Sequence, residues 1–562
     1  MPSRLASLAL TMLLTLGPAT SAQQPQNSTD QSTTIRSTTR LVQVSVVALD
    51  NHGNPITGLT KDDFTVTDEG RPQKISVFSA ESPTPNAPVQ PLPSNVFTNR
   101  FDLKGQDPGA VTIILFDALN TSSPDQSYAR KQVLKFLQTL PPQDHVALYA
   151  LTTRLYRLHD FTRDSTALVN AVNHFTVEQT AAFEASTTAF IDLVSITGDP
   201  DWAGGGPGNF QASLNNANGI IADQALLNRA VSTASAIEAI ANHVAVVPGR
   251  KSLVWISGGF PLQIGLDHIG RADRISQSVT PDVQRAIRAL NQANVSIYPV
   301  DVHGVEVSSG IDPSQRGPGS GSGVDSSFFN RQNRLDTYRD LADRTGGVAF
   351  YGNNDISAGI RRAFDDGRFA YTIGFYPDHN SWDGKFREIK IKPTTPDAQL
   401  RYRKGYFAVP ERTDTADEVK IDLEQAAVSP LNSTSLGIVV VGKPAGATDD
   451  RNLELRMSLD PKQFLLHDVA GHHTGALDMM FMQNAPNGEV LAAEKQHFEV
   501  NFDDQQYTYL SGVGIVLLRH IKVAPQATQI RVIVRDAASG SLGSVSMPVK
   551  AFYPTPAGTP VS

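Results

Sequence analysis

The sequence predicts an α/β protein, in which a doubly wound domain with a parallel sheet carries flanking β domains and precedes a C-terminal β-sandwich. Three patterns predict this fold. Apolar strands alternate with helical stretches up to residue 369, period-2 patterns return after 368, and β patterns without a convincing helix fill residues 426–554. Because a chain of 562 residues exceeds one ordinary domain, we expect about two to four domains.

The composition narrows the class of protein. Hydrophobic residues make up 40% of the chain and charged residues 19%, which indicates a globular protein with a sizeable core. The net charge of -8 argues against nucleic acid as the main partner. The chain has no cysteine, which excludes disulfides, thiolate metal sites, cysteine nucleophiles and a lipid-bearing cysteine.

The N-terminus predicts export. Residues 1–22 have the pattern of a signal peptide, because an apolar stretch follows Arg4 and small residues precede a cleavage site after Ala22. That stretch is too short to span a bilayer, and no other segment approaches about 18 uninterrupted apolar residues. Residues 23–38, rich in Gln, Ser and Thr, are expected to form a flexible leader. We therefore expect a secreted or periplasmic protein that does not span the membrane.

Two segments precede the α/β domain. Residues 39–80 show period-2 alternation with turn signals at Asn51–Pro55 and Asp68–Gly70, which predicts an N-terminal β unit of three or four strands. Residues 81–108 are rich in proline and predict a linker.

Residues 109–369 form the predicted doubly wound domain, because strands and helices alternate there. The expected strands are 111–116, 145–151, 251–257 and 295–302, with a further extended stretch at 346–351. The expected helices are 124–140, 165–175, 222–245, 282–293, 335–344 and 355–366. Two glycine-rich insertions, 203–210 and 314–327, are expected to be mobile loops.

The C-terminal third returns to β patterns. Residues 370–410 contain three period-2 runs, which we expect to pair with the N-terminal β unit. Residues 411–562 are predicted to form a separate C-terminal β-sandwich domain.

The residues of the α/β domain resemble those of a von Willebrand factor type A (VWA) domain. The segments that carry the resemblance are the strand ending in Asp at 111–117, QDHVALYALTT, GRKSLVWISGGFP, ANVSIYPVDV and LADRTGGVAFYGNNDISAGIRRAFDD. The flanking segments VTDEGRPQKISVF and YTIGFYPDHNSWDGKFREIKI extend the resemblance to a bacterial family of secreted VWA-related proteins that is abundant in acidobacteria. It covers residues 36–410, and residues 411–562 resemble no particular family.

The resemblance implies a Rossmann-like fold with a metal-ion-dependent adhesion site at the C-terminal ends of its strands. The family motif D-x-S-x-S reads Asp117-Ala118-Leu119-Asn120-Thr121 here, so the middle serine is Leu119. The T-D-G motif of the fourth strand reads Ser257-Gly258-Gly259, and the loop threonine of the family falls in the insertion 176–221, which does not align. The site implied is therefore degenerate. Its metal ligands would be Asp117, Asn120 and Thr121, holding Mg²⁺ (or Mn²⁺ or Ca²⁺) weakly, with Ser122 as a possible supplement.

The same stretch also has a structural interpretation. Ser123 as N-cap, Pro124 at the first helical position and Gln126 three residues after the cap fit a capping box. Asp117 would then accept hydrogen bonds from backbone amides of the loop 119–123. Metal binding and a hydrogen-bonded loop both remain open at this point.

Other candidate groups are weaker. Asp301 and His303 lie at the same strand ends as Asp117 and could ligate metal or act as an acid–base pair, although an Asp that closes a strand is usually a turn residue. His467, His472 and His473 could hold a metal, but a loop between strands explains them as well. No phosphate loop, nucleophile elbow or catalytic triad is present in the sequence.

The sequence therefore predicts an exported, non-enzymatic protein of the adhesion type, which binds an unknown protein ligand of the cell envelope or the extracellular space. One alternative is a structural module with a vestigial site that binds through loops 176–221 and 304–333. A hydrolase that uses the same strand ends or the histidines of 467–473 is a further alternative.

Overall fold

The computed structural model describes the greater part of the chain between residues 41 and 553. The described ranges are 41–80, 92–104, 111–141, 145–175, 209–247, 249–259, 271–304, 326–379, 381–395, 397–408, 415–446 and 450–553. The signal peptide and leader, and nearly all of the two glycine-rich insertions, lie outside these ranges. Within them, no helix is both long enough and apolar enough to cross a bilayer.

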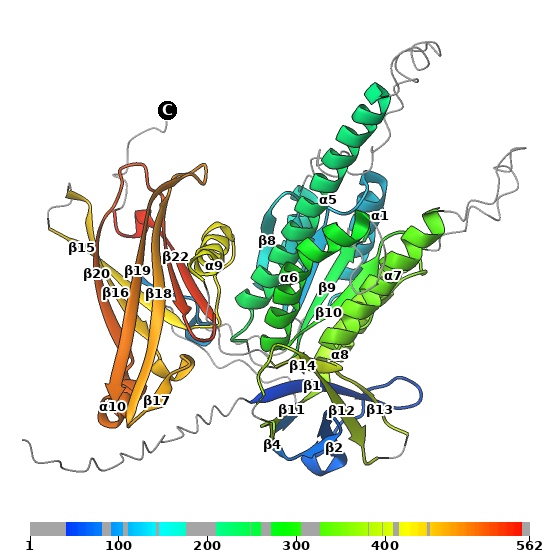
Figure 1. Ribbon diagram of the computed structural model, residues 1–562, viewed down its shortest axis with the longest axis horizontal. Coiled ribbons are helices and arrows are strands. Elements are labelled where there is room, and N and C mark those ends of the chain that lie inside the picture. The colour runs from blue at the N-terminus through cyan, green and yellow to red at the C-terminus, as the bar shows by residue number, and fades with distance from the viewer. Residues whose placement is uncertain are drawn as a thin grey trace, which may run out of the picture. The chain divides into compact units, whose positions relative to one another are not determined.

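A five-stranded sheet forms the centre of the α/β domain (Figure 1). Its order is β10 (Val295–Asp301), β9 (Lys251–Ser257), β6 (Val111–Asp117), β7 (His145–Leu151) and β8 (Leu155–Thr162). The first four strands are parallel, and β8 returns antiparallel to β7 as a hairpin. The sequence did not predict β8. As the edge strand it is only partly buried, and its residues do not alternate regularly between buried and exposed.

Helices cover both faces of this sheet, which confirms the doubly wound α/β fold. On one face α5 (Asn209–His243), α6 (Arg271–Gln292) and α7 (Ser326–Thr345) pack on odd-numbered residues of β6 such as Ile113 and Leu115. On the other face α1 (Ser123–Leu137), α2 (Ser165–His174) and α8 (Ile356–Arg368) pack on Ile114 and its neighbours.

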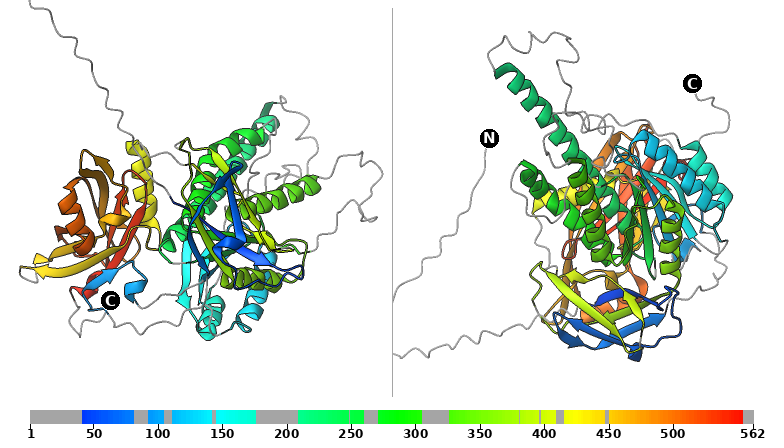
Figure 2. Two further views of the ribbon diagram at one scale, coloured as in Figure 1. Left: turned by 90° about the horizontal axis from the view of Figure 1, so that it is seen from below. Right: turned by 90° about the vertical axis from the view of Figure 1, so that its right-hand side faces the viewer.

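Three of these helices begin earlier than the sequence predicts. The helix α5 has 35 residues and runs well past the sheet (Figures 1 and 2), whereas the apolar periodicity indicated only 222–245. The periodicity is a signal of burial, so it marks the part of α5 that packs on the sheet. The helix α6 likewise extends through Pro281, and α7 starts nine residues before its expected start at 335.

The N-terminal β unit and the segment after the α/β domain form one sandwich. Its strands are β1 (Val42–Leu49), β2 (Phe64–Asp68), β3 (Arg71–Gln73), β4 (Ile75–Ala80), β11 (Ala370–Phe375), β12 (Phe386–Pro393), β13 (Gln399–Arg401) and β14 (Gly405–Phe407). The two sheets have the orders β13-β1-β11-β4 and β14-β12-β2-β3, so each mixes strands from both segments. Val44, Phe64, Ile373 and Ile391 belong to its shared core.

The C-terminal domain is a second sandwich with its own core. One sheet has the order β20 (Ile515–Lys522), β16 (Asn452–Leu459), β15 (Ile438–Ala445) and β5 (Val96–Thr98). The other contains β17 (His467–Val469), β18 (His472–Asn484), β21 (Gln529–Asp536) and β22 (Leu542–Pro548), with β19 (Val490–Asp503) paired to β18. The segment 81–108, expected as a linker, thus supplies β5 as an edge strand of this sandwich.

The expectation of no helix between 426 and 554 was wrong. The helix α10 (Asp504–Val513) joins β19 to β20, and α9 (Ala416–Val428) precedes β15. Asp503 caps α10 in a capping box with Gln506, and Gly514 ends it with a φ of 83°. The helix was missed because it buries no residue and therefore has no apolar stripe.

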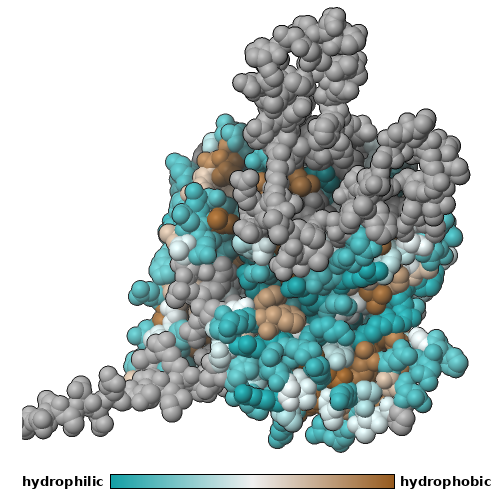
Figure 3. Space-filling view, turned by 45° about the vertical axis from the view of Figure 1, so that its right-hand side comes forward, coloured by the Kyte–Doolittle hydropathy of each residue, from teal (hydrophilic) through white to brown (hydrophobic). Residues whose placement is uncertain are grey.

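The surface follows the usual partition of side chains. Figure 3 shows a face on which hydrophilic residues dominate and hydrophobic ones occur in small groups. This is expected for a chain whose large apolar side chains pack inside.

Candidate functional site

The candidate site lies at the C-terminal ends of β6, β9 and β10. We call this edge the rim and define it as residues 117–123, 257–259 and 301–304 with the first turn of α1. Parallel strands of an open α/β sheet present their ligand-binding loops at this edge. The structure brings the sequence-predicted residues Asp117, Asn120 and Thr121 together here.

Asp117 ends β6 and is buried, with 1% of its surface exposed. Its Oδ2 accepts hydrogen bonds from Asn120 Nδ2 at 2.8 Å, Ser257 Oγ at 2.8 Å and Trp255 Nε1 at 3.0 Å. Its Oδ1 accepts from the backbone N–H of Asn120 at 3.0 Å. The carboxyl group therefore has four donors, of which the sequence indicated only the loop amide.

Burial raises the pKa of Asp117, and the hydrogen bonds from Asn120, Ser257 and Trp255 oppose that rise. Each of these donors compensates part of the desolvation that a buried carboxyl group suffers. The four bonds are therefore what allows a carboxyl group to sit inside the domain.

Asn120 connects the loop to the long helix α5. Its Nδ2 also donates to Thr233 Oγ1 at 2.8 Å, and its Oδ1 accepts from Arg229 Nε at 3.0 Å. Arg229 is 7% exposed, and burial lowers its pKa while the charge of Asp117 raises it. An arginine side chain thus brings positive charge close to the buried carboxyl group. Arg229 was missed because it lies in α5, 109 residues from Asn120 and next to the insertion that did not align.

Thr121 fastens the loop to both neighbouring strands. Its Oγ1 donates to the carbonyl of Asp117 at 2.5 Å and accepts from the backbone N–H of Gly258 at 2.9 Å. The hydroxyl group therefore joins β6 to the end of β9 with one donated and one accepted hydrogen bond.

The residues present do not fit a divalent cation. Mg²⁺ requires several oxygen lone pairs directed at one point. Here the oxygens of Asp117 point at N–H and O–H donors, the amide oxygen of Asn120 accepts from Arg229, and Thr121 Oγ1 accepts from Gly258. Among the described residues, no group of three or more His, Asp or Glu side chains is placed to hold a metal.

Close packing leaves no room for a side chain at Gly258. A Cβ atom at this position would lie 2.6 Å from the carbonyl oxygen of Asn120 and 3.4 Å from Cε1 of His303. The loop after β6 thus passes directly over Gly258. A side chain there would require the loop to move.

The start of α1 differs by one residue from the prediction. Ser122, and not Ser123, is the N-cap, and its Oγ accepts from the N–H of Asp125 at 3.5 Å. Gln126 does not complete a capping box, because it is the fourth residue after Ser122; its Nε2 donates to the carbonyls of Ala118 at 3.0 Å and Thr121 at 2.7 Å. The physical reason is that those loop carbonyls have no strand partner and lie within reach of Gln126.

Asp301 and His303 also meet at the rim. His303 Nδ1 lies 2.7 Å from Asp301 Oδ1, and Arg334 Nη2 of α7 donates to Asp301 Oδ2 at 3.4 Å. His303 Nε2 lies 3.9 Å from Asp125 Oδ2. The side chains of His303 and Asp125 remain 26% and 31% exposed, so they form the accessible polar part of the rim.

The three candidate histidines of the C-terminal sandwich each make a separate contact. His472 Nδ1 is 2.9 Å from Asn501 Oδ1, and His473 Nε2 is 2.9 Å from Asp504 Oδ1. The ring of His473 also stacks on Tyr507 with centroids 4.1 Å apart, while His467 pairs with Thr474 across β17 and β18. The contacts of His473 join α10 to the sheet, and that of His472 joins β18 to β19, so both histidines are accounted for without a metal.

Comparisons with known proteins give distant structural likenesses. No protein-family model and no curated protein matches the chain. An aerotolerance-related membrane protein from Bacteroides fragilis is 13% identical over 46% of this chain and 100% of that chain, with a TM-score of 0.23. A von Willebrand factor type A protein from Catenulispora acidiphila is 11% identical over 78% of this chain and 64% of that chain, with a TM-score of 0.24.

A third solved structure contains the N-terminal domains of the type V pili tip protein Mfa5 from Porphyromonas gingivalis. It is 9% identical over 85% of this chain and 97% of that chain, with a TM-score of 0.26. At such scores none of the three decides a function for this chain. We call residues 109–369 the VWA-like domain, after the order of its strands and the placement of its helices on both faces.

Proposed function

We propose that the chain is an exported, non-enzymatic protein-binding module of the adhesion type, which presents the rim of its VWA-like domain to a protein partner. The observation that carries the proposal is the internal hydrogen bonding of Asp117, Asn120 and Thr121. These bonds hold the rim loop in one conformation. A preorganised loop loses little conformational entropy when a partner binds.

The chemistry of the rim favours binding over catalysis. A hydrolase needs a nucleophile within hydrogen-bond reach of a base. The hydroxyl groups of Thr121 and Ser257 bond to Asp117 instead, and in the described part of the rim no hydroxyl group bonds to His303. His303 is the base that such an enzyme would use, and among the described rim residues no nucleophile is bonded to it, which supports a binding role.

The accessible rim has mixed charge. Asp125, His303 and Arg334 have side-chain exposures of 31%, 26% and 15%, and they surround the buried Asp301. Polar groups at an interface contribute mainly to specificity and to the association rate. A protein partner of the cell envelope or the extracellular space, with a complementary polar surface, would fit this arrangement.

The test starts from the purified chain without its first 22 residues, immobilised and cross-linked to envelope and culture fractions. Captured proteins are identified, purified and measured for direct binding. Asp125→Lys, which reverses a rim charge, should weaken binding by about tenfold or more if the rim is the interface. Lys390→Glu, at a residue of the N-terminal sandwich with 58% of its side chain exposed, is the control and should bind as the wild type does.

Two outcomes would overturn the proposal. Unchanged affinity of Asp125→Lys, with an unchanged melting temperature, would favour the structural module that binds through loops 176–221 and 304–333. Turnover of a peptide, ester or glycan by the wild type that is lost in His303→Ala would favour the hydrolase.

A further inference from the structure

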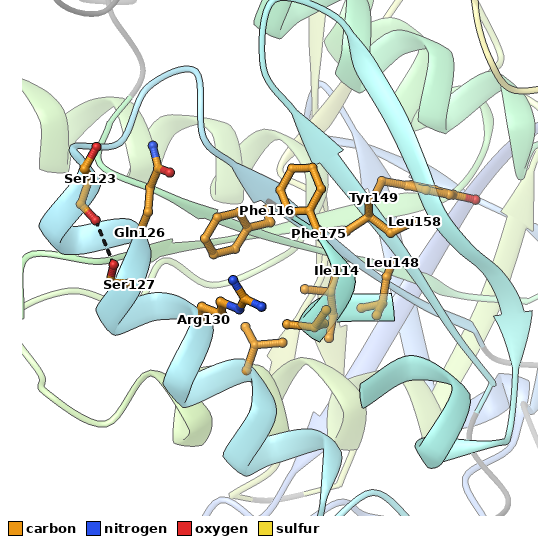
Figure 4. Close-up of a pocket in the computed structure, with 12 residues that line it drawn as sticks. Ile114, Phe116, Ser123, Gln126, Ser127, Arg130, Leu148, Tyr149, Leu158 and Phe175 are labelled. Atoms are coloured by element: carbon orange, nitrogen blue, oxygen red, sulfur yellow. Dashed lines mark hydrogen bonds between the residues drawn. The ribbon is translucent and has the colours of Figure 1, made fainter. Parts of the chain in front are cut away.

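A cavity of about 180 Å³ lies beside the central sheet, on the face covered by α1 and α2 (Figure 4). Its apolar wall comes from three strands and from α2 with the residue that follows it. The residues concerned are Ile114, Phe116, Leu148, Leu158, Val172 and Phe175. An apolar cavity of about 150 Å³ in a protein interior stays dry and accepts a molecule of the size of benzene. This cavity therefore has room for one ring or one short acyl chain.

Arg130 is the one charged residue among those that line the cavity. Its guanidinium group points into the space beside Phe116 and Ile114 (Figure 4). Its Nη2 donates to the carbonyl of Asn173 at 2.7 Å, which fixes the side chain against α2. Among the described residues that line the cavity none is acidic, so no carboxylate of this part of the wall neutralises the charge.

Apart from Tyr149 of β7, the remaining polar residues of the wall are Ser123, Gln126 and Ser127 on the first turns of α1. Ser127 Oγ donates to the carbonyl of Ser123 at 3.1 Å, as the dashed line in Figure 4 shows. Gln126 donates both its side-chain bonds to the rim loop. The polar side of the cavity therefore offers donors from Arg130 and belongs to the same helix that supports the rim.

We propose that this cavity binds a small apolar monocarboxylate, with the ring or acyl chain against the sheet and the carboxylate on Arg130. A guanidinium group suits this role because its planar set of N–H donors matches a carboxylate in two parallel hydrogen bonds. The proposal concerns a site apart from the rim and goes beyond the proposed function.

The size and polarity of the cavity exclude larger or more highly charged ligands. A dianion such as a phosphate monoester would pair only one of its charges, because Arg130 is the one charged side chain among the described residues that line the cavity. A neutral hydrocarbon would leave the guanidinium group without its strongest type of partner. A ligand with one carboxylate and one apolar group can pair its charge with Arg130 and place its apolar part against the apolar wall.

The experiment measures binding to the full chain by ligand-observed NMR and calorimetry. The charged probes are benzoate, as the aromatic form, and hexanoate, as the acyl form. The neutral probes are benzyl alcohol and 1-hexanol, which have similar apolar parts. The wild type should bind at least one of the two carboxylates in the millimolar range or better, as expected for ligands of this size.

Three variants locate the site. Arg130→Gln should weaken carboxylate binding by about tenfold or more, with a smaller effect on the matching alcohol. Lys131→Gln is the control, because Lys131 is the exposed neighbour of Arg130 on α1 and carries the same charge. Val172→Trp should fill the cavity and abolish binding of both acids and alcohols.

Each contrary result would overturn the proposal. The first is that neither carboxylate binds the wild type. The second is that Arg130→Gln binds the carboxylates as tightly as the wild type does. The third is that Lys131→Gln loses as much affinity as Arg130→Gln, which would indicate a general charge effect. If Val172→Trp does not fold, the comparison of Arg130→Gln with Lys131→Gln still decides, because neither substitution changes a core side chain.

Discussion

At the scale of single residues, Asp117 illustrates how a buried carboxyl group is stabilised without a metal. It accepts from Asn120, Trp255 and Ser257, and Arg229 bonds to Asn120 on the far side. A chain of hydrogen bonds of this kind is cooperative, because each member polarises the next. The positive charge that a metal would bring in a complete adhesion site comes here from a side chain of α5.

Replacing Arg229 should lower the free energy of unfolding. Arg229→Met keeps an unbranched side chain but leaves the buried Oδ1 of Asn120 without its donor, so we expect a loss of about 1–3 kcal/mol in the free energy of unfolding. Urea unfolding measures this loss. Asn228→Met, at the exposed preceding position of α5, is the control and should have little effect. An equal effect of both substitutions would contradict the role of Arg229.

The same hydrogen bonds predict how the protein responds to divalent cations. Because the oxygens of Asp117, Asn120 and Thr121 already accept hydrogen bonds or face donors, Mg²⁺ and Mn²⁺ should leave the melting temperature of the wild type unchanged. A rise in melting temperature that disappears in Asp117→Ala would contradict this and would restore the metal interpretation.

A second buried carboxyl group gives a prediction on pH. Asp68 is 2% exposed, accepts from the hydroxyl group of Tyr406 at 2.9 Å, and has an Oδ1 without a hydrogen-bond partner. Burial raises its pKa and Glu69 adds to the rise, whereas Tyr406, His379 and the charge of Arg387 oppose it. The folded protein therefore holds this proton more tightly than the unfolded chain.

The sign of the effect follows from that difference. The stability that the protonated Asp68 contributes is complete below the unfolded pKa of about 3.9 and is lost as the pH rises through the raised folded pKa. The free energy of unfolding of the wild type should thus fall relative to that of Asp68→Asn as the pH rises above about 4 and through the raised folded pKa. Asp62→Asn, at an exposed position, is the control. A difference that stays constant or grows with pH would exclude this explanation.

Single residues of the site were predictable only where a local sequence pattern marks them. Asp117 was noticed because it ends an apolar strand, and Asn120 and Thr121 were named because the stretch resembles the metal motif of VWA domains. Trp255 and Ser257 lie 138 and 140 residues away, and a contact at that separation leaves no local pattern. Trp255 is fully buried in the middle of an apolar strand, and nothing in that pattern indicates the bond from its Nε1 to Asp117.

At the scale of elements, the loop after β6 and the end of β9 are packed as one unit. The loop passes over Gly258, whose backbone N–H bonds to Thr121 Oγ1. The absence of a side chain at position 258 is therefore part of the contact between these two elements.

Substitutions at Gly258 test that packing. Gly258→Ala and Gly258→Asp should each lower the free energy of unfolding by about 1–3 kcal/mol, because a Cβ atom would lie 2.6 Å from the carbonyl oxygen of Asn120. Gly258→Asp should also gain no response to Mg²⁺, although it restores the aspartate of the family. Gly512→Ala, where a Cβ atom meets nothing within 4 Å, is the control and should not destabilise. A stabilising effect of Mg²⁺ on Gly258→Asp would contradict the packing argument.

Element boundaries show where local signals succeed and fail. The strands β6, β7, β9 and β10 were predictable to within a residue or two, because each is buried on both faces and reads as a continuous apolar run. The helix α10 was not, since its signal lies in its capping residues and not in an apolar stripe. The N-cap of α1 was misplaced by one residue because Ser122 and Ser123 are chemically equivalent.

At the scale of the whole molecule, two segments far apart in the chain complete domains that neither could form alone. The strands β1 to β4 pair with β11 to β13 across the entire VWA-like domain, so that domain is inserted into the N-terminal sandwich. The period-2 patterns of both segments made this pairing foreseeable. The position of β5 was not, because three strand residues in a proline-rich segment resemble any other linker.

The contacts of β5 predict that the C-terminal sandwich depends on it. Its residues Val96, Phe97 and Thr98 pair with β15, and the ring of Phe97 lies 5.5 Å from that of Phe552. The following residue, Asn99, is 1% exposed and bonds to the carbonyls of Ser433 and Leu436 and to the N–H of Ile438, each at 2.7 Å.

A fragment of residues 415–553 should therefore melt at a lower temperature than the same domain in the full chain, because it lacks this edge strand and leaves buried backbone groups without partners. A peptide of residues 93–101 added in trans should bind the fragment and raise its melting temperature, since a ligand of the folded state stabilises it by mass action. A peptide with Phe97→Ala and Asn99→Ala is the matched control and should have no effect. If the fragment is as stable alone as in the full chain, or if both peptides act equally, residues 93–101 are a linker after all.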